Sequence, residues 1–168
     1  KKKIVFADLK LNDIPNTCSS TIKTLRDLKI NYLTVHISSG LDSLKAVKKF
    51  SGKTKIVGVS TLTSLNDKDL RETGHTKSVK NLVIHQAKLA KKANLDAIVC
   101  SAHEAPYVKK IFKKEIITPG VQIGKRNYDQ KRSMEAKKVE SDWLVIGRAI
   151  TARGNIKKNI QNLVKELR

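Results

Sequence analysis

The sequence contains no long hydrophobic run and few aromatic residues. No apolar stretch in its 168 residues approaches the roughly 20 that a membrane-spanning helix needs, and no signal peptide opens the chain, so we expect no membrane association. Aromatic residues make up only 4% of the chain, which offers few platforms for stacking on nucleic-acid bases. With 39% hydrophobic and 30% charged residues, the composition is that of one globular domain with its own core.

Cysteine is also scarce. Cys18 and Cys100 lie far apart, and neither belongs to a CxxC pair or to a histidine spacing typical of a metal site. We interpret both as reduced thiols of a cytoplasmic protein. The sequence therefore predicts neither a disulfide framework nor a metal centre.

Acidic residues are fewer than lysines and arginines, and the formal net charge is +20. Such a charge attracts the phosphate backbone of nucleic acids, but here the lysines are scattered along the expected helices and arginines are few. We interpret the lysines as a solvated exterior and expect no nucleic-acid partner. The positive field also suits a small, phosphorylated, anionic substrate.

Short apolar runs alternate with amphipathic stretches over the whole chain. Continuous apolar runs are typical of strands buried on both faces, and the stretches between them repeat their apolar residues at helical spacing. Ser101 and Glu104 form a capping-box pattern ahead of a helix that has Pro106 in its first turn, and we expect Trp143 in the core. The expected strands are Ile4–Phe6, Tyr32–Ile37, Ile56–Leu62, Leu95–Ser101, Ile116–Thr118 and Trp143–Gly147.

Regular βα alternation predicts a parallel sheet, either doubly wound or closed into a barrel. Six units in 168 residues average 28 residues each. Eight such units would need about 224 residues, close to a compact TIM (β/α)₈ barrel. We therefore expect a single (β/α) barrel domain over residues 1–168, with about six of the eight units present.

Glycines near the end of the chain indicate which units these are. Phosphate groups in such barrels usually bind to the loops after strands seven and eight, and the last two expected strands here lead into Pro119-Gly120 and Gly147-Arg148. Small residues let backbone N–H groups approach phosphate oxygens, and Arg148 can add a charge-assisted fork. This predicts a barrel of the phosphate-binding type whose first two units are absent from the sequence.

The most informative stretch follows the first apolar run. On a strand, Asp8 and Lys10 point to the same face, and Asp13 follows once the chain has turned. An alternating acid-base-acid array can neutralise itself while holding one charge close to a bound substrate. The array is typical of an active site, although the spacing alone also allows a surface salt bridge beside a turn.

The run Asp-x-Lys-x-x-Asp-Ile-Pro-Asn-Thr, residues 8–17, resembles the signature of orotidine 5′-phosphate decarboxylases, the family that makes UMP in the last step of pyrimidine biosynthesis. Further landmarks of the family follow in order over the whole chain. They are residues 35–40, 62–64, 95–101, 118–121, 129–132 and 145–148.

The resemblance implies a homodimeric TIM barrel without metal or organic cofactor, in which each active site is completed by the neighbouring subunit. Asp8 would face the substrate carboxylate, Lys10 would protonate C6 of the pyrimidine, and Asp13 would reach into the partner's site. The loop 119–130 would act as a lid. The substrate-binding residues implied are Ile14 and Thr17 beside Asp13, Thr63 near the pyrimidine, and Gln122, Gln130, Gly147 and Arg148 around the phosphate.

The sequence departs from the family at Gln122, in the segment 122–143, which is a few residues short, and in its missing front. Gln122 stands where the family has an arginine, which weakens the expected grip on the phosphate. The first two strands of the family, which supply an aspartate to the ribose and a lysine to the charge array, have no counterpart here. Lys1-Lys2-Lys3 is a poor substitute for that lysine.

Other interpretations remain open. One is a metal-dependent sugar-phosphate decarboxylase or aldolase of the same superfamily, which magnesium dependence would reveal. Another is an inactive basic barrel that binds an anion such as RNA. We interpret His36, at the end of an expected strand, as a hydrogen-bonded structural residue, and His75, His85 and His103 as surface residues.

Overall fold

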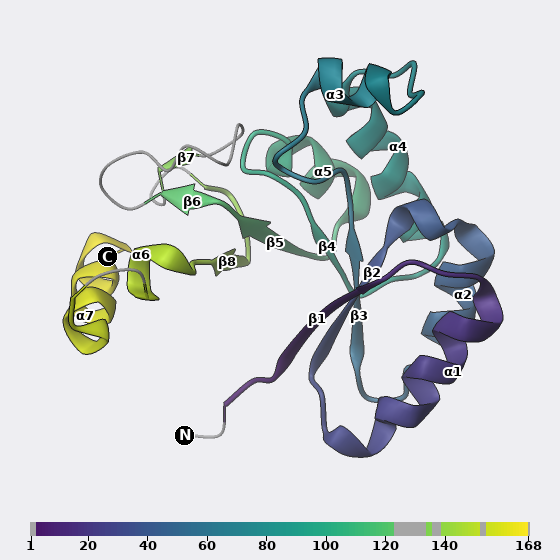
Figure 1. Ribbon diagram of the computed structural model, residues 1–168, viewed down its shortest axis with the longest axis horizontal. Helices are drawn as coiled ribbons and strands as arrows, with labels where there is room; N and C mark the ends of the chain where they lie inside the picture. Colours follow the sequence, from purple (N-terminus) through teal and green to yellow (C-terminus); the bar gives the residue numbers. More distant parts are fainter. Residues whose placement is uncertain (1–2, 123–133, 136–138, 152–153, 168) are drawn as a thin grey trace.

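The structure is a computed structural model that describes residues 3–122, 134–135, 139–151 and 154–167. Six parallel strands form one curled sheet in the order β1-β2-β3-β4-β5-β8 (Figure 1). The predicted parallel sheet of six βα units is confirmed. The strands are β1 (Phe6–Leu11), β2 (Tyr32–His36), β3 (Lys55–Val59), β4 (Ala97–Val99), β5 (Glu115–Pro119) and β8 (Trp143–Val145).

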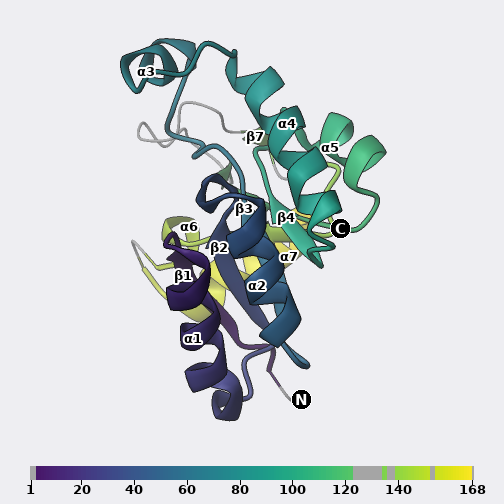
Figure 2. The ribbon, with the colours of Figure 1, turned by 90° about the vertical axis from the view of Figure 1, so that its right-hand side faces the viewer.

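Helices cover the convex face of the sheet. Figure 2 shows α1, α2, α4 and α5 side by side, and neighbouring helices in this row pack against one another. The helices are α1 (Pro15–Leu25), α2 (Leu41–Phe50), α3 (Asp67–Glu72), α4 (Val79–Lys92), α5 (Ala105–Phe112), α6 (Arg148–Thr151) and α7 (Ile156–Leu167), with 3₁₀ turns η1 (Arg26–Leu28) and η2 (Ile37–Ser39). A separate two-stranded pair joins β6 (Val121–Gln122) to β7 (Met134–Glu135).

The main core lies between the sheet and these helices. Alternate residues of β2, such as Leu33 and Val35, point into it, while Tyr32 lies on the concave face. Gly58 in β3 is required by close packing, because a Cβ there would lie 2.8 Å from Leu95 Cδ1 and 2.9 Å from Ile37 Cγ1. Cys18 and Cys100 are both buried, and both belong to this core.

The two edge strands differ from the expectation. β1 begins at Phe6 and continues through Asp8 and Lys10, so the predicted strand Ile4–Phe6 was placed too early. Both edges are also open to solvent, because Phe6 is 38% exposed and Trp143 is 43% exposed. The prediction of strands buried on both faces holds for β2 to β5 but is wrong for β1 and β8. The prediction that Trp143 lies in the core is also wrong. An apolar hollow of about 340 Å³, lined in part by Phe6 and Trp143, occupies the concave face between these edges.

The helix after β4 starts later than the capping pattern predicts. Its N-cap is Glu104, and the Ser101 hydroxyl donates a hydrogen bond to the Glu104 carboxylate, so the capping box expected at Ser101 is wrong. Pro106 does lie in the first turn. A full capping box occurs instead at Asn66 and Asp69, where it starts the short helix α3.

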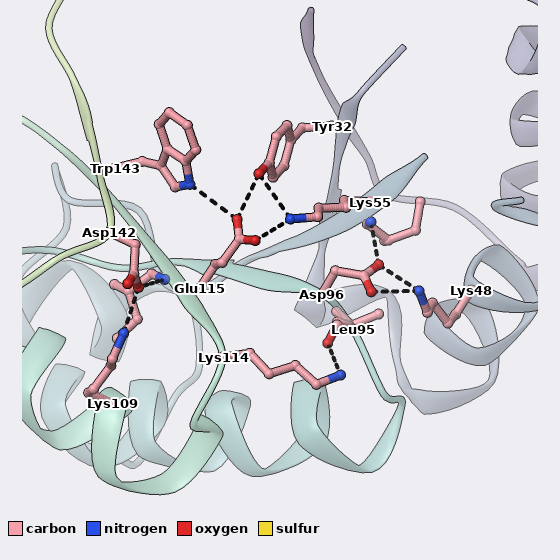
Figure 3. Close-up of polar contacts among 12 residues, drawn as sticks. Tyr32, Lys48, Lys55, Leu95, Asp96, Lys109, Lys114, Glu115, Asp142 and Trp143 are labelled. Atoms are coloured by element: carbon pink, nitrogen blue, oxygen red, sulfur yellow. Dashed lines mark hydrogen bonds and ion pairs between the residues drawn. The ribbon is translucent and has the colours of Figure 1, made fainter. Parts of the chain in front are cut away.

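Polar side chains join the amino ends of the strands. Figure 3 shows the Glu115 carboxylate accepting hydrogen bonds from the Tyr32 hydroxyl at 2.8 Å and the Trp143 indole at 3.1 Å, and pairing with the Lys55 ammonium. Asp96 accepts from Lys48 and from the Ile56 amide in the same region (Figure 3). These contacts brace the amino end of the sheet and leave its carboxyl end for other roles. None of the described helices is long and apolar enough to cross a membrane.

Candidate active site

The centre of the site is an ion pair on β1. Lys10 Nζ lies 2.5 Å from Asp8 Oδ2, and the two side chains are 43% and 49% exposed. The prediction that these two side chains lie next to each other is therefore confirmed. The pair lies toward the carboxyl end of β1, the edge of a parallel sheet where substrates bind.

The backbone that presents this pair is irregular. Lys10 has a φ of 50°, in the left-handed region that non-glycine residues rarely adopt. The register between β1 and β2 also shifts, since Ala7 pairs with Leu33 while Leu11 pairs with Val35. Four residues of β1 thus face two of β2, and Lys10 lies within this bulge while its ammonium contacts Asp8.

Two residues of β2 face the pair, and the sequence gives only a weak signal for either. The Thr34 hydroxyl contacts both Asp8 and Lys10, and its side chain is fully buried. Burial lowers the pKa of His36, the positive charge of Lys10 lowers it further, and Asp8 opposes this shift. His36 is therefore an electrostatic neighbour of the site. Thr34 and His36 both belong to an expected apolar strand, and this is the one signal in the sequence that points to both residues.

Asp13 and Ile14 lie in a separate surface groove just beyond β1. The groove has a volume of about 590 Å³ and includes Ser39 and Gly40 from the loop before α2. The Asp13 carbonyl accepts a hydrogen bond from the Ser43 hydroxyl at 2.9 Å, which anchors the turn. Ile14 is 65% exposed, unusual for a large apolar side chain, and Thr17 is exposed in the first turn of α1.

The remaining predicted residues follow other strands at the same edge. Thr63 lies in the segment after β3, and Gly147 and Arg148 lie where β8 leads into α6. At Gly147, an added Cβ would meet no described atom within 4 Å, so packing does not require a glycine there. The Gln122 backbone forms part of β6. Gln130 and most of the predicted lid, residues 123–130, lie outside the described residues.

The described residues hold no cluster of three or more histidine, cysteine, aspartate or glutamate side chains that could bind a metal ion. The candidate site combines the ion pair of Asp8 and Lys10 with the loops that follow several parallel strands. A (β/α) barrel with a paired lysine and aspartate at its carboxyl end defines an enzyme fold suited to chemistry on an anionic substrate.

Comparison with known proteins identifies the family. The model of the orotidine 5′-phosphate decarboxylase / HUMPS family matches residues 1–163, and the chain belongs to this family. The orotidine 5′-phosphate decarboxylase of Wolbachia pipientis subsp. Culex pipiens is 42% identical over 170 residues, covering 97% of this chain and 75% of the relative. That of Buchnera aphidicola subsp. Schizaphis graminum is 38% identical over 174 residues, covering 98% and 74%.

Solved structures of orotidine 5′-phosphate decarboxylases have a similar fold. The orotidine 5′-phosphate decarboxylase of Lactobacillus acidophilus superposes with a TM-score of 0.83 at 29% identity, covering 98% of this chain and 75% of that one. The orotidine 5′-monophosphate decarboxylase of Methanocaldococcus jannaschii, solved with the inhibitor BMP, gives a TM-score of 0.75 at 26% identity, covering 98% and 74%. The TIM-barrel fold class is confirmed, and the chain spans about three quarters of the length of these relatives.

Proposed function

We propose that this chain carries out the decarboxylation of orotidine 5′-monophosphate to UMP and CO₂ in pyrimidine biosynthesis. Membership of the family and the similarity to named decarboxylases support the reaction. The observation that carries the proposal is the ion pair between Asp8 and Lys10, because it places an ammonium and a carboxylate side by side at the carboxyl end of the sheet.

The chemistry calls for this arrangement. When the bond between C6 and the carboxylate breaks, its electron pair stays on C6, where no adjacent carbonyl can take the charge as an enolate. The Lys10 ammonium stabilises that developing charge and then donates a proton from Nζ to C6. Asp8 disfavours the substrate carboxylate in the ground state and holds Lys10 in place through the 2.5 Å contact.

The phosphate supplies binding energy far from the reacting carbon. We assign this group to the loop after β8, where Gly147 leaves open space beside its backbone and Arg148 adds a guanidinium. Gln130 adds to the proposed phosphate grip, Gln122 contributes more weakly than the arginine that the family has there, and Thr63 contacts the pyrimidine.

The proposal includes a homodimer with shared sites. Asp13 reaches into the partner's site, accompanied by Ile14 and Thr17. The exposed Ile14 and the open groove beside it support a surface that a second subunit would cover.

The test is an assay of orotidine 5′-monophosphate decarboxylation, followed by loss of substrate absorbance, with the natural full-length protein and a metal chelator present. We expect turnover, and at least a ~10³-fold loss of kcat in Lys10→Ala. Lys109→Ala is the matched control, because Lys109 forms a similarly exposed ion pair with Asp142 at 2.6 Å, at the amino end of β8. It should retain activity within about twofold.

Two results would count against the proposal. Near-normal turnover in Lys10→Ala would remove Lys10 as the proton donor. A wild-type protein that leaves orotidine 5′-monophosphate intact, or that needs added magnesium, would point to the metal-dependent sugar-phosphate members of the superfamily.

A further inference from the structure

Thr34 occupies an unusual position between the two central residues of the site. It lies on β2, next to β1, and its side chain is 0% exposed. Its hydroxyl donates a hydrogen bond to Asp8 Oδ1 at 2.9 Å and accepts one from the Lys10 backbone N–H at 2.8 Å. A single hydroxyl thus contacts the side chain of one residue and the backbone of the other.

These contacts close a ring. Asp8 accepts from Thr34 on Oδ1 and from Lys10 Nζ on Oδ2, so each carboxylate oxygen has its own donor. Lys10 in turn donates its backbone N–H to Thr34. Because the two donors hold different oxygens, the carboxylate plane cannot rotate without breaking one of the contacts.

The backbone contact compensates for the bulge. Lys10 adopts a left-handed conformation where β1 shifts register against β2, so a regular ladder partner is not in place there. The Thr34 hydroxyl supplies the acceptor for the Lys10 N–H at this point. A strained backbone of this kind persists only where its surroundings hold it.

We infer that Thr34 is a positioning residue that fixes the Asp8 carboxylate and the Lys10 backbone relative to each other through its hydroxyl. This inference rests on the proposed function for its effect on turnover, but the hydrogen bonds themselves do not depend on the substrate. Thr34 does not act on the substrate. It keeps the ammonium and the carboxylate in the geometry that the transition state needs.

The test compares Thr34→Val with Thr34→Ser in the natural full-length protein. Valine has the shape of threonine but lacks the hydroxyl, so we expect kcat to fall about 10- to 100-fold, while KM for orotidine 5′-monophosphate changes less than about threefold. Serine keeps the hydroxyl and should restore kcat to within about threefold of wild type. If the valine variant does not fold, Thr34→Ala against Thr34→Ser makes the same comparison.

Thr54→Val is the matched control. Thr54 donates a hydrogen bond to the Ile30 carbonyl at 2.9 Å just before β3, at the opposite end of the sheet. This variant removes one threonine hydroxyl from the fold and should keep kcat within about twofold of wild type.

A second measurement does not need turnover. Hydrogen exchange of the Lys10 amide, followed by NMR without substrate, should become about 5- to 10-fold faster in Thr34→Val and stay near wild type in Thr34→Ser. Unchanged exchange, or a serine variant as slow in turnover as the valine variant, would overturn the role of the hydroxyl. If the wild-type protein does not decarboxylate orotidine 5′-monophosphate, the proposed function fails and the exchange result alone decides the role of Thr34.

Discussion

The Tyr32 hydroxyl donates a hydrogen bond to Glu115 Oε2 at 2.8 Å, although their strands β2 and β5 are not neighbours in the sheet. The contact therefore crosses the concave face, and the Tyr32 ring also packs edge-on against Trp143 at 6.1 Å. The Glu115 carboxylate thus accepts hydrogen bonds from three other strands. The donors are Tyr32 on β2, Lys55 on β3 and Trp143 on β8. This cluster holds the curl of the sheet at its amino end, opposite the ion pair of Asp8 and Lys10.

Replacing the Glu115 carboxylate should therefore weaken the fold. In Glu115→Gln the negative charge is lost and one acceptor oxygen becomes an NH₂ donor, and we expect the free energy of unfolding to fall by about 1–3 kcal/mol in urea denaturation. Glu72→Gln is the control, because Glu72 is 63% exposed and pairs with Lys68 at 3.8 Å, so its loss should cost less than about 0.5 kcal/mol. Equal effects in the two variants would contradict a bracing role for Glu115.

The same carboxylate predicts how stability depends on pH. Burial tends to raise the pKa of Glu115, but hydrogen bonds from Lys55, Tyr32 and Trp143 outweigh burial and hold the pKa below its usual value near 4.5. A lowered folded-state pKa means that this stabilisation is complete above the unfolded-state pKa and is lost as the pH falls through the folded-state pKa. Burial likewise tends to raise the pKa of Asp142, but Lys109 and the Ile116 amide lower it overall.

We therefore expect the free energy of unfolding to decline as the pH drops below about 4.5, and to decline less steeply in Glu115→Gln. Urea titrations at several pH values between neutrality and acid will measure both slopes. Parallel slopes in the two proteins would show that Glu115 does not contribute to the acid sensitivity.

Gly58 offers a test of packing. An added methyl would lie 2.8 Å from Leu95 Cδ1 and against Ile37, inside the core between β3 and the helices. We expect Gly58→Ala to reduce the free energy of unfolding by about 1–3 kcal/mol, because the closely packed neighbours must shift. Thermal melts of the variant and the wild type will show this as a lower Tm, and an unchanged Tm would mean that the core adapts freely.

Gly147 should behave in the opposite way. Described atoms leave space for a Cβ there, so Gly147→Ala should change the free energy of unfolding by less than about 0.5 kcal/mol. If its backbone faces the substrate phosphate, the methyl obstructs that approach, and KM for orotidine 5′-monophosphate should rise about 5- to 30-fold. An unchanged KM would place the phosphate elsewhere.

The sequence predicts the centre of the sheet better than its edges. Residues of β2 and β5 are buried on both faces and form continuous apolar runs, so hydrophobicity alone locates them. β1 carries Asp8 and Lys10 in its middle, so hydrophobicity alone ends the expected strand at Phe6, where β1 begins. The six-residue α3 is too short to show helical periodicity, and its capping box at Asn66 and Asp69 emerges only from the structure.

The geometry of the candidate site is likewise only partly predictable from the sequence. The spacing of two residues correctly brings Asp8 and Lys10 together, but the bulge and the left-handed Lys10 that achieve it do not follow from local pattern. They depend on Thr34, which is 24 residues away in the chain and meets Lys10 only when β2 pairs with β1. Contacts between strands set this geometry, and a single sequence does not display them.

Shared active sites give the most specific prediction. Asp8→Ala and Asp13→Ala should each be nearly inactive, yet a mixed preparation that is unfolded and refolded together should regain activity. In a hybrid dimer, the site with intact Asp8 and Lys10 receives Asp13 from the other subunit, and the second site carries both defects. Random pairing in equal amounts therefore predicts about one quarter of wild-type activity for a symmetric dimer.

The control is a mixture of Asp8→Ala with Lys10→Ala. Both residues belong to one ion pair within a single subunit, so every hybrid site lacks one of them and no activity should return. Recovery in the first mixture alone would show that Asp13 acts across the interface. If neither mixture recovers, Asp13 serves the site of its own subunit, and the groove beside Ile14 needs another explanation.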